Sequence, residues 1–187
     1  MVRNKEGIEV FTLSSPDRDF KDFRGITRLQ AGLDDFLAVL YDVKSLEVWG
    51  HNIRSAELLE RPSDSMQVYY AVAAAPFPYR DRDGVYRNRF EWDAGTRTLL
   101  VRIDLLPDYL PEKEDRVRVS GSGYWKVVEL PGGELDVTFE MRMDPGGNVS
   151  AWLANMFAGD TPYHTLLGLR DILKESKYRG KAHALIR

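Results

Sequence analysis

Hydrophobic and polar positions alternate along much of the chain between residues 52 and 144, with the two-residue period of antiparallel strands. The alternation predicts strands at 52–61, 65–74, 85–93, 96–106, 116–130 (in one or two pieces) and 134–144. Turn-forming residues separate them at 62–64, 93–95 and 131–133. Shorter runs at 7–13 and 20–31 predict an opening pair of strands. The middle of the chain is therefore predicted to be an antiparallel meander.

The period changes twice to that of an α-helix. Apolar residues spaced i, i+3, i+4 and i+7 predict an amphipathic helix over 33–41, and a short helical piece is expected over 43–49. From Ser150 onward a second apolar stripe predicts a long terminal helix, which Gly159 and Pro162 should break or kink near its middle. Strands, short helices, a meander and one long helix indicate the α+β class.

Composition narrows the possible functions. The chain has 187 residues, of which 43% are hydrophobic, enough for one well-cored domain. A net charge of −3 provides no field to attract nucleic acid. No apolar run is long enough to span a membrane, and the first residues lack the pattern of a secretory signal, so we expect a soluble protein. Its compartment stays open between cytoplasm and periplasm, since a removed leader would leave no trace.

Three neighbouring strands agree on which of their faces is apolar. The inward positions are Tyr86, Asn88, Phe90, Trp92, Leu99, Val101, Ile103, Leu105, Leu135, Val137, Phe139, Met141 and Met143. We expect a broad concave face, and one helix over so wide a sheet leaves either a filled core or a cavity. An amide among aromatic rings must find partners or cost about 1–3 kcal/mol. Asn88 is thus either paired inside the core or exposed to a wet or liganded pocket.

Four stretches together resemble one known family. They are GIEVFTL at 7–13, DVKSLEVWGHNI at 42–53, PFPYRDRDGV at 76–85, and DPGGNVSAWLANMF at 144–157 leading through a proline into LLGLRDIL at 166–173. Gly123 and Trp125 match a further Gly-x-Trp pattern. The chain resembles the START domain, the StAR-related lipid-transfer family of the helix-grip superfamily, as a bacterial single-domain member. The resemblance covers about residues 6–175, within one domain spanning 1–187.

The resemblance implies a fold and a function. A curved antiparallel sheet would wrap a long C-terminal helix, and the chain would bind, and transfer or sense, a lipid, fatty acid or sterol-like ligand in the cavity between them. The expected ligand-binding residues are Tyr70, Tyr86, Asn88, Phe90, Leu99, Val101, Ile103, Trp125, Val137, Phe139, Met141, Trp152, Met156, Phe157 and His164. Tyr124 and Arg170 are further polar candidates. A monomer that contacts membranes transiently is expected.

The Arg80–Asp83 charge cluster corresponds in the family to a tight connection between strands. Arg82 and Asp83 are therefore expected to be architectural, with charges that pair across the turn. The family's animal sterol carriers hold an acid and an arginine inside the tunnel, where this chain has Tyr69 or Tyr70 and Asn88. That departure weakens cholesterol as the expected ligand.

Catalytic chemistry finds little support in the sequence. Cysteine is absent, the three histidines at 51, 164 and 183 lack metal-ligand spacing, and no nucleophile elbow or phosphate-binding loop is present. We therefore expect no metal, no cofactor and no enzyme activity. The alternative is a cyclase, aromatase or hydrolase of the same superfamily that uses His164, Asp104 and Tyr86 as its acid and base residues.

Overall fold

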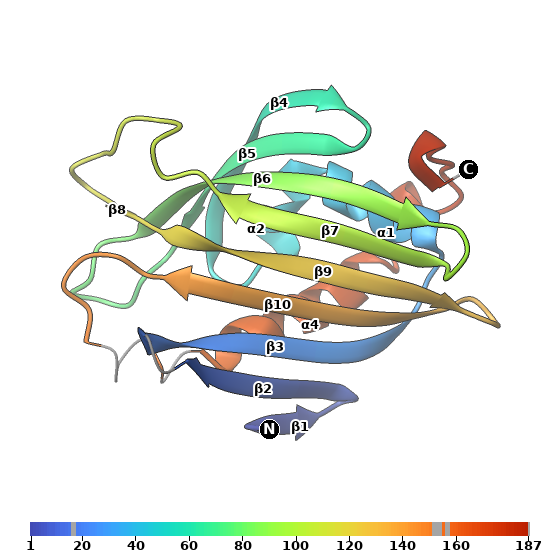
Figure 1. The fold of residues 1–187 in the computed structure, drawn as a ribbon, viewed down its shortest axis with the longest axis horizontal. Helices are drawn as coiled ribbons and strands as arrows, with labels where there is room; N and C mark the ends of the chain where they lie inside the picture. The colour runs from blue at the N-terminus through green and yellow to red at the C-terminus, as the bar shows by residue number, and fades with distance from the viewer. Residues whose placement is uncertain (16–17, 151–154, 156–157, 187) are drawn as a thin grey trace.

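The computed structural model describes residues 1–15, 18–150, 155 and 158–186. Its ten described strands form one curved sheet in the order β1-β2-β3-β10-β9-β7-β6-β5-β4, with β8 paired in parallel to the start of β6 (Figure 1). The strands are β1 (Arg3–Lys5), β2 (Ile8–Ser15), β3 (Arg18–Gln30), β4 (Ile53–Ser63), β5 (Met66–Ala73), β6 (Arg82–Asp93), β7 (Thr98–Leu105), β8 (Val117–Arg118), β9 (Ser120–Leu130) and β10 (Glu134–Asp144). The opening strands thus lie beside the last one.

The helices lie against one face of this sheet (Figure 1). They are α1 (Leu33–Tyr41), η1 (Val43–Ser45), α2 (Leu46–Trp49), α4 (Asp160–Ile172), η2 (Ser176–Tyr178) and η3 (Ala184–Ile186). The C-terminal tail returns to α1, where the Tyr178 hydroxyl donates to Asp42 and the Gly180 amide donates to Asp35. None of the described helices is long and apolar enough to cross a membrane.

The periodicities in the sequence predicted most of these elements. The helix over 33–41 is confirmed with the same bounds, and each predicted strand is present within a few residues. The predicted break of the terminal helix agrees with the structure: residue 155 is helical, residues 158–159 form a turn, and α4 begins at Asp160 with Gly159 as its N-cap. Pro162 then lies in the first turn, where a helix needs no backbone donor, so it does not kink α4. Strands β8 and β9 are the two pieces of the strand predicted over 116–130, and the short strand β1 was not predicted.

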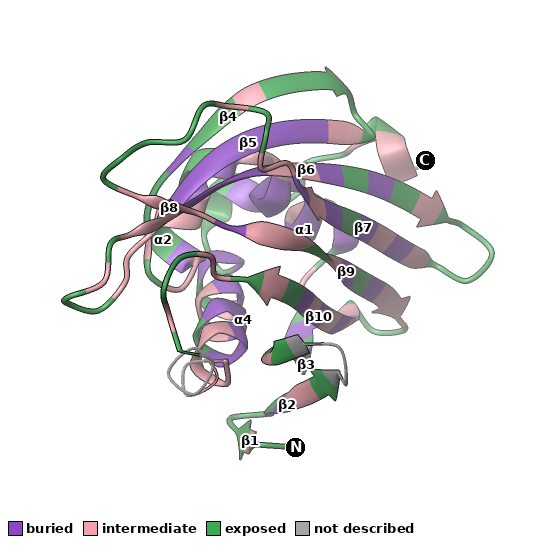
Figure 2. Ribbon diagram, turned by 60° about the vertical axis from the view of Figure 1, so that its left-hand side comes forward, coloured by how far each residue is buried: buried purple, intermediate pink, exposed green. Residues whose placement is uncertain are grey.

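Side chains from the sheet and from α1, α2 and α4 form one hydrophobic core. Along β6 and β7 buried positions alternate with more exposed ones, as Figure 2 shows. Strand β5 differs, because residues 67–72 are all buried. Its second face is covered by a smaller cluster, made of Val68, Tyr70, Val72 and Val85 with Leu59, Leu106 and Leu110 packed against it.

The charge cluster at residues 80–83 joins separate segments of the fold. The two arginines bond backbone carbonyl oxygens: Arg80 donates to Glu114, and Arg82 donates to Pro145 and Arg80. The two aspartates form ion pairs, Asp81 with Arg54 and, in a buried position, Asp83 with Arg118. The prediction that these residues are architectural agrees with these contacts. The prediction that their charges pair across the turn is wrong, because their charged partners come from β4 and β8.

Candidate functional site

The concave face of the sheet consists of side-chain rows that run across the strands. One row contains Gln67, Asn88, Ile103, Gly123, Met141 and Phe23, which are successive cross-strand partners from β5 to β3. The next row contains Phe90, Val101, Trp125, Phe139 and Gly25. On the other side of the Asn88 row, Tyr69 pairs with Tyr86, and Tyr86 pairs with Leu105. Residues far apart in sequence therefore meet on one apolar surface.

Helix α4 packs closely on the Gly25 end of the Phe90 row, whereas Phe90 and Trp125 contact aromatic side chains of α1 and α2. Trp125 and Phe139 stack with ring centroids 4.0 Å apart. At the end of the row Gly25 leaves room for α4, because a Cβ there would lie 2.6 Å from Cδ1 of Leu166. Leu166 is itself fully buried. The space between sheet and helix is therefore filled with side chains at this point.

The Asn88 and Tyr86 rows lie beyond this filled region, toward η1 and α2. Tyr69 and Tyr86 stack with ring centroids 5.1 Å apart and an interplanar angle of 9°. Burial raises the pKa of the Tyr69 phenol, and burial raises the pKa of Tyr86 to about 12. Tyr86 nevertheless keeps some accessible surface.

Asn88 is a buried amide beside these two phenols. It is 4% exposed and its side chain is hydrogen-bonded to Tyr69, but within the described part of the chain its Oδ1 atom accepts no hydrogen bond. The sequence left two alternatives for Asn88, pairing inside the core or exposure to a wet or liganded pocket. Pairing of all its polar atoms inside the core is not observed.

The structure brings most of the expected ligand-binding residues together. Phe90, Leu99, Val101, Ile103, Trp125, Val137, Phe139 and Met141 belong to the core cluster that also contains Leu166 and Leu169 of α4. Tyr86 and Asn88 share their face. Trp152, Met156 and Phe157 lie outside the described residues. Asn155 in that segment is described, and its side chain bonds the backbone of Asp19 and Lys21.

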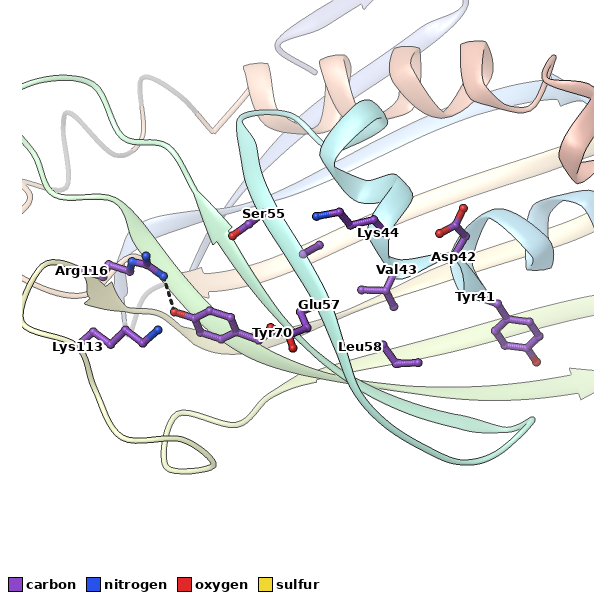
Figure 3. Close-up of a pocket in the computed structure, with 11 residues that line it drawn as sticks. Tyr41, Asp42, Val43, Lys44, Ser55, Glu57, Leu58, Tyr70, Lys113 and Arg116 are labelled. Carbon is purple, nitrogen blue, oxygen red and sulfur yellow. Dashed lines mark hydrogen bonds between the residues drawn. The ribbon is translucent and has the colours of Figure 1, made fainter.

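Tyr70 does not join this group. It points to the opposite face of the sheet, where its hydroxyl donates to Asp83 and accepts from Arg116. It lines a surface groove of about 600 Å³ along the edge strand β4 (Figure 3). The other lining residues are Tyr41, Asp42, Val43, Lys44, Ser55, Ala56, Glu57, Leu58, Lys113 and Arg116. Tyr69 occupies the concave position that the sequence left open between the two tyrosines.

A second groove, of about 390 Å³, lies on the convex face of the sheet. Its side chains pair with one another: Asp104 bonds Arg87 and Arg89, and Glu140 accepts from Arg24 and Tyr124. Tyr124, a polar candidate from the sequence, is therefore remote from the concave face. Arg170 donates to Thr27, which is the cross-strand partner of Val137 on the β3 end of the concave face, and to the carbonyl oxygen of Glu6.

His164 lies exposed on the first half of α4 and stacks on His51, with ring centroids 4.8 Å apart. The backbone amide of His51 donates to Thr165, so this pair joins α4 to the connection between α2 and β4. The acid and base residues named by the enzyme hypothesis are thus not assembled: His164 is on a helix surface, Asp104 on the convex face and Tyr86 on the concave face. No three potential metal ligands cluster among the described residues.

Solved structures of low sequence identity share this fold. The human protein STARD10 matches with a TM-score of 0.80 at 14% identity, over 94% of this chain and 73% of that one. The ZhuI aromatase/cyclase of a Streptomyces species matches with a TM-score of 0.54 at 16% identity, over 86% of this chain and 96% of that one. At these identities the likeness shows the fold alone. No family model matches the sequence.

Two relatives are more similar in sequence. The STAR-related lipid transfer protein of Xanthomonas axonopodis is 36% identical with a TM-score of 0.86, over 93% of this chain and 97% of the solved fragment. The uncharacterized protein PA1579 of Pseudomonas aeruginosa is 30% identical over 171 residues, 91% of this chain and 84% of that protein. With the curved antiparallel sheet and its C-terminal helix, these similarities confirm the resemblance noted in the sequence. The chain belongs to the StAR-related lipid transfer (START) family and has its helix-grip fold.

Proposed function

We propose that the protein binds one hydrophobic, lipid-like molecule against the concave face of its sheet, and transfers or senses it. The observation that carries this proposal is the similarity to the Xanthomonas lipid transfer protein over nearly the whole of both chains. The apolar rows of β6, β7, β9 and β10 supply the matching chemistry. Each methylene removed from water contributes about 0.8 kcal/mol, so a long acyl chain gains substantial affinity before association costs are subtracted.

The ligand's position follows from where the core is filled. Since α4 packs closely on Gly25, and α1 and α2 cover Phe90 and Trp125, the ligand would lie toward the Tyr86 and Asn88 rows. That end is bordered by η1 and α2, whose residues Val43 and Leu46 pack near Tyr69. Entry would require a shift of the loops at 108–114 and 146–148. Transient membrane contact and a monomeric state are part of this proposal.

Binding without catalysis is the reading that the site favours. The cyclase or hydrolase alternative rests on likeness of fold, and its proposed acid and base residues lie on three separate surfaces. A charged pair or a histidine on the concave face beside Tyr86 would have supported it; in the described residues the buried pair of Asp83 and Arg118 lies on the opposite face of the sheet, and His51 and His164 stack on each other at α4.

Native mass spectrometry of the gently purified protein tests this function. A bound apolar molecule, identified after solvent extraction, is the expected result, and delipidated protein should take up a fluorescent lipid. Protein that carries no such mass and takes up no fatty acid, phospholipid, acylglycerol or sterol would contradict the proposal. Turnover of an aromatic polyketide surrogate, abolished in Tyr86→Phe, would favour the enzyme.

A further inference from the structure

Asn88 and Gln67 are buried amides that face each other across β6 and β5, and both have partners, but among the described residues only the Gln67 oxygen accepts a hydrogen bond, whereas Asn88 is bonded to Tyr69 and keeps its Oδ1 atom unpaired. Gln67 donates to the carbonyl oxygen of Leu40 at 2.9 Å and accepts from Arg61 at 2.9 Å. The Oδ1 atom of Asn88 is equally buried and accepts nothing. An unpaired buried acceptor costs about 1–3 kcal/mol. A binding partner that arrives from outside the chain would remove that cost.

The surroundings of Asn88 disfavour a charged partner. The buried polar and charged residues described are Thr27, Ser45, Gln67, Asp83, Asn88 and Thr165. The one charged member, Asp83, lies on the opposite face of the sheet with Arg118. The guanidinium of Arg61 is already bonded to Gln67 and to the Tyr41 carbonyl oxygen. A carboxylate or phosphate brought to Asn88 would therefore lose its water without gaining a free cation.

Burial acts in the same direction on the two phenols beside Asn88, Tyr69 and Tyr86. The raised pKa values of Tyr69 and Tyr86 show that a negative charge is unfavourable on this part of the concave face. Both phenols consequently stay protonated at neutral pH and remain able to donate and to accept. The stacked rings also provide a flat apolar surface next to the amide.

We infer that the ligand is an uncharged amphiphile with a hydroxyl group, of the long-chain alcohol or monoacylglycerol type, whose hydroxyl donates to Oδ1 of Asn88. This inference rests on the proposed lipid-binding function and specifies its ligand class. A hydroxyl can donate to the amide oxygen while it accepts from a neighbouring phenol. An ionised fatty acid only accepts, so it cannot satisfy Oδ1.

A ligand series of one chain length tests this assignment: dodecanol, monolauroylglycerol, laurate and methyl laurate, each used to displace Nile red from the delipidated full chain at neutral pH. The alcohol and the monoacylglycerol should bind at least roughly tenfold more tightly than laurate and methyl laurate, as expected for one buried hydrogen bond. In Asn88→Leu the preference should disappear, while affinity for methyl laurate stays the same or rises. Tyr70→Phe, altered on the other face, should keep the wild-type ranking.

The possible outcomes distinguish failure of the hydroxyl assignment from failure of the proposed lipid-binding function. Binding of all four compounds with similar affinity, or an unchanged ranking in Asn88→Leu, would overturn the hydroxyl assignment and leave lipid binding intact. Tighter binding of laurate than of dodecanol would overturn it as well. Failure of every compound, together with failure to take up any fluorescent lipid, would overturn both. The wild-type ranking alone decides the question if the Asn88 variant does not fold.

Discussion

Asp83 on β6 and Arg118 on β8 form an ion pair with 3.0 Å between Oδ1 and Nε, and their side chains are only 1% and 3% exposed. Arg118 also donates to the carbonyl oxygens of Pro107, Leu110 and Pro111. One buried guanidinium thus fixes the loop between β7 and β8 on the convex face. Burial acts to raise the pKa of Asp83, but hydrogen bonds from Arg118 and Tyr70 outweigh it and leave that pKa lowered.

Replacing Asp83 with Asn should destabilise the protein strongly. The substitution leaves the Arg118 guanidinium buried without its counter-charge, and breaking a buried pair from one side costs about 3–5 kcal/mol. Urea unfolding followed by tryptophan fluorescence measures the loss. Glu91→Gln is the matched control, because its pair with Arg102 is exposed and should contribute less than about 1 kcal/mol. Equal losses in both variants would show that the buried pair has no special role.

The stacked pair of His51 and His164 should make the attachment of α4 sensitive to acid. Burial, followed by the charge of His164, lowers the pKa of His51, while Asp160 acts in the opposite direction. The unfolded chain then binds a proton more readily than the folded one. Stability from His51 is therefore complete above its ordinary pKa of about 6.5 and is lost as the pH falls below that value.

Thermal unfolding at a series of pH values checks this sign. The thermal unfolding midpoint of the wild type should decrease as the pH is lowered from about 7 to about 5. The substitution His51→Gln should make this decrease smaller. His164→Gln, which removes the second ring of the stack, should reduce it less. A slope that is identical in all three proteins would place the acid sensitivity elsewhere.

The contact between α4 and α2 should not tolerate a methyl group at Gly168. A Cβ at this position would overlap the carbonyl oxygen of Trp49 and lie 3.0 Å from its Cα. Alanine normally favours a helix over glycine by about 1 kcal/mol, but a backbone oxygen cannot move aside as a side-chain tip can. We expect Gly168→Ala to lower the free energy of unfolding by about 1–3 kcal/mol.

Gly159→Ala is the control for Gly168→Ala. At this N-cap a Cβ would meet only Cγ2 of Val2, at 3.5 Å, an ordinary contact. The same chemical change should therefore cost less than about 1 kcal/mol in denaturant unfolding. A larger loss at Gly159 than at Gly168 would contradict this account of the α2–α4 contact.

Local periodicity predicted the elements, and what it missed depends on contacts between distant segments. The spacing of Leu33, Phe36 and Leu40 defines one apolar helical face, so that helix was predicted with its bounds. Strand β5 was predicted as a strand, but its sequence did not show which of its faces is apolar. The loop after β7 covers its convex side and buries Tyr70 as fully as Tyr69. Alternation therefore could not tell which tyrosine faces the helices.

For the candidate site too, the sequence predicted which residues share a face but not the contacts between distant segments. Alternation along β6, β7 and β10 correctly collected the concave residues, since each strand has one solvated face. The stacking of His164 on His51 joins residues 113 positions apart, and no local pattern encodes it. Asn88 is the residue for which sequence reasoning correctly left two alternatives, because pairing depends on the cross-strand neighbour and on the helix above it.

Asn88 and Gln67 should respond in opposite ways to apolar replacement in the ligand-free protein. Asn88→Leu removes a buried acceptor that has no partner among the described residues, at the expense of one hydrogen bond to Tyr69, so stability should stay the same or rise by about 1 kcal/mol. Gln67→Met removes a donor to the Leu40 carbonyl and an acceptor for Arg61, and should cost about 1–3 kcal/mol. Urea unfolding of delipidated protein measures both changes.

The comparison of these two amides is informative because they share a cross-strand pair, a burial class and a chemical group. Differences in strand position or solvent exposure therefore cannot explain opposite signs. Equal destabilisation by both substitutions would mean that Asn88 contributes to the core as Gln67 does, with nothing left for a ligand to satisfy. A gain in stability limited to Asn88→Leu, coupled with loss of the preference for hydroxyl ligands, would mean that this amide is retained for binding at the expense of stability.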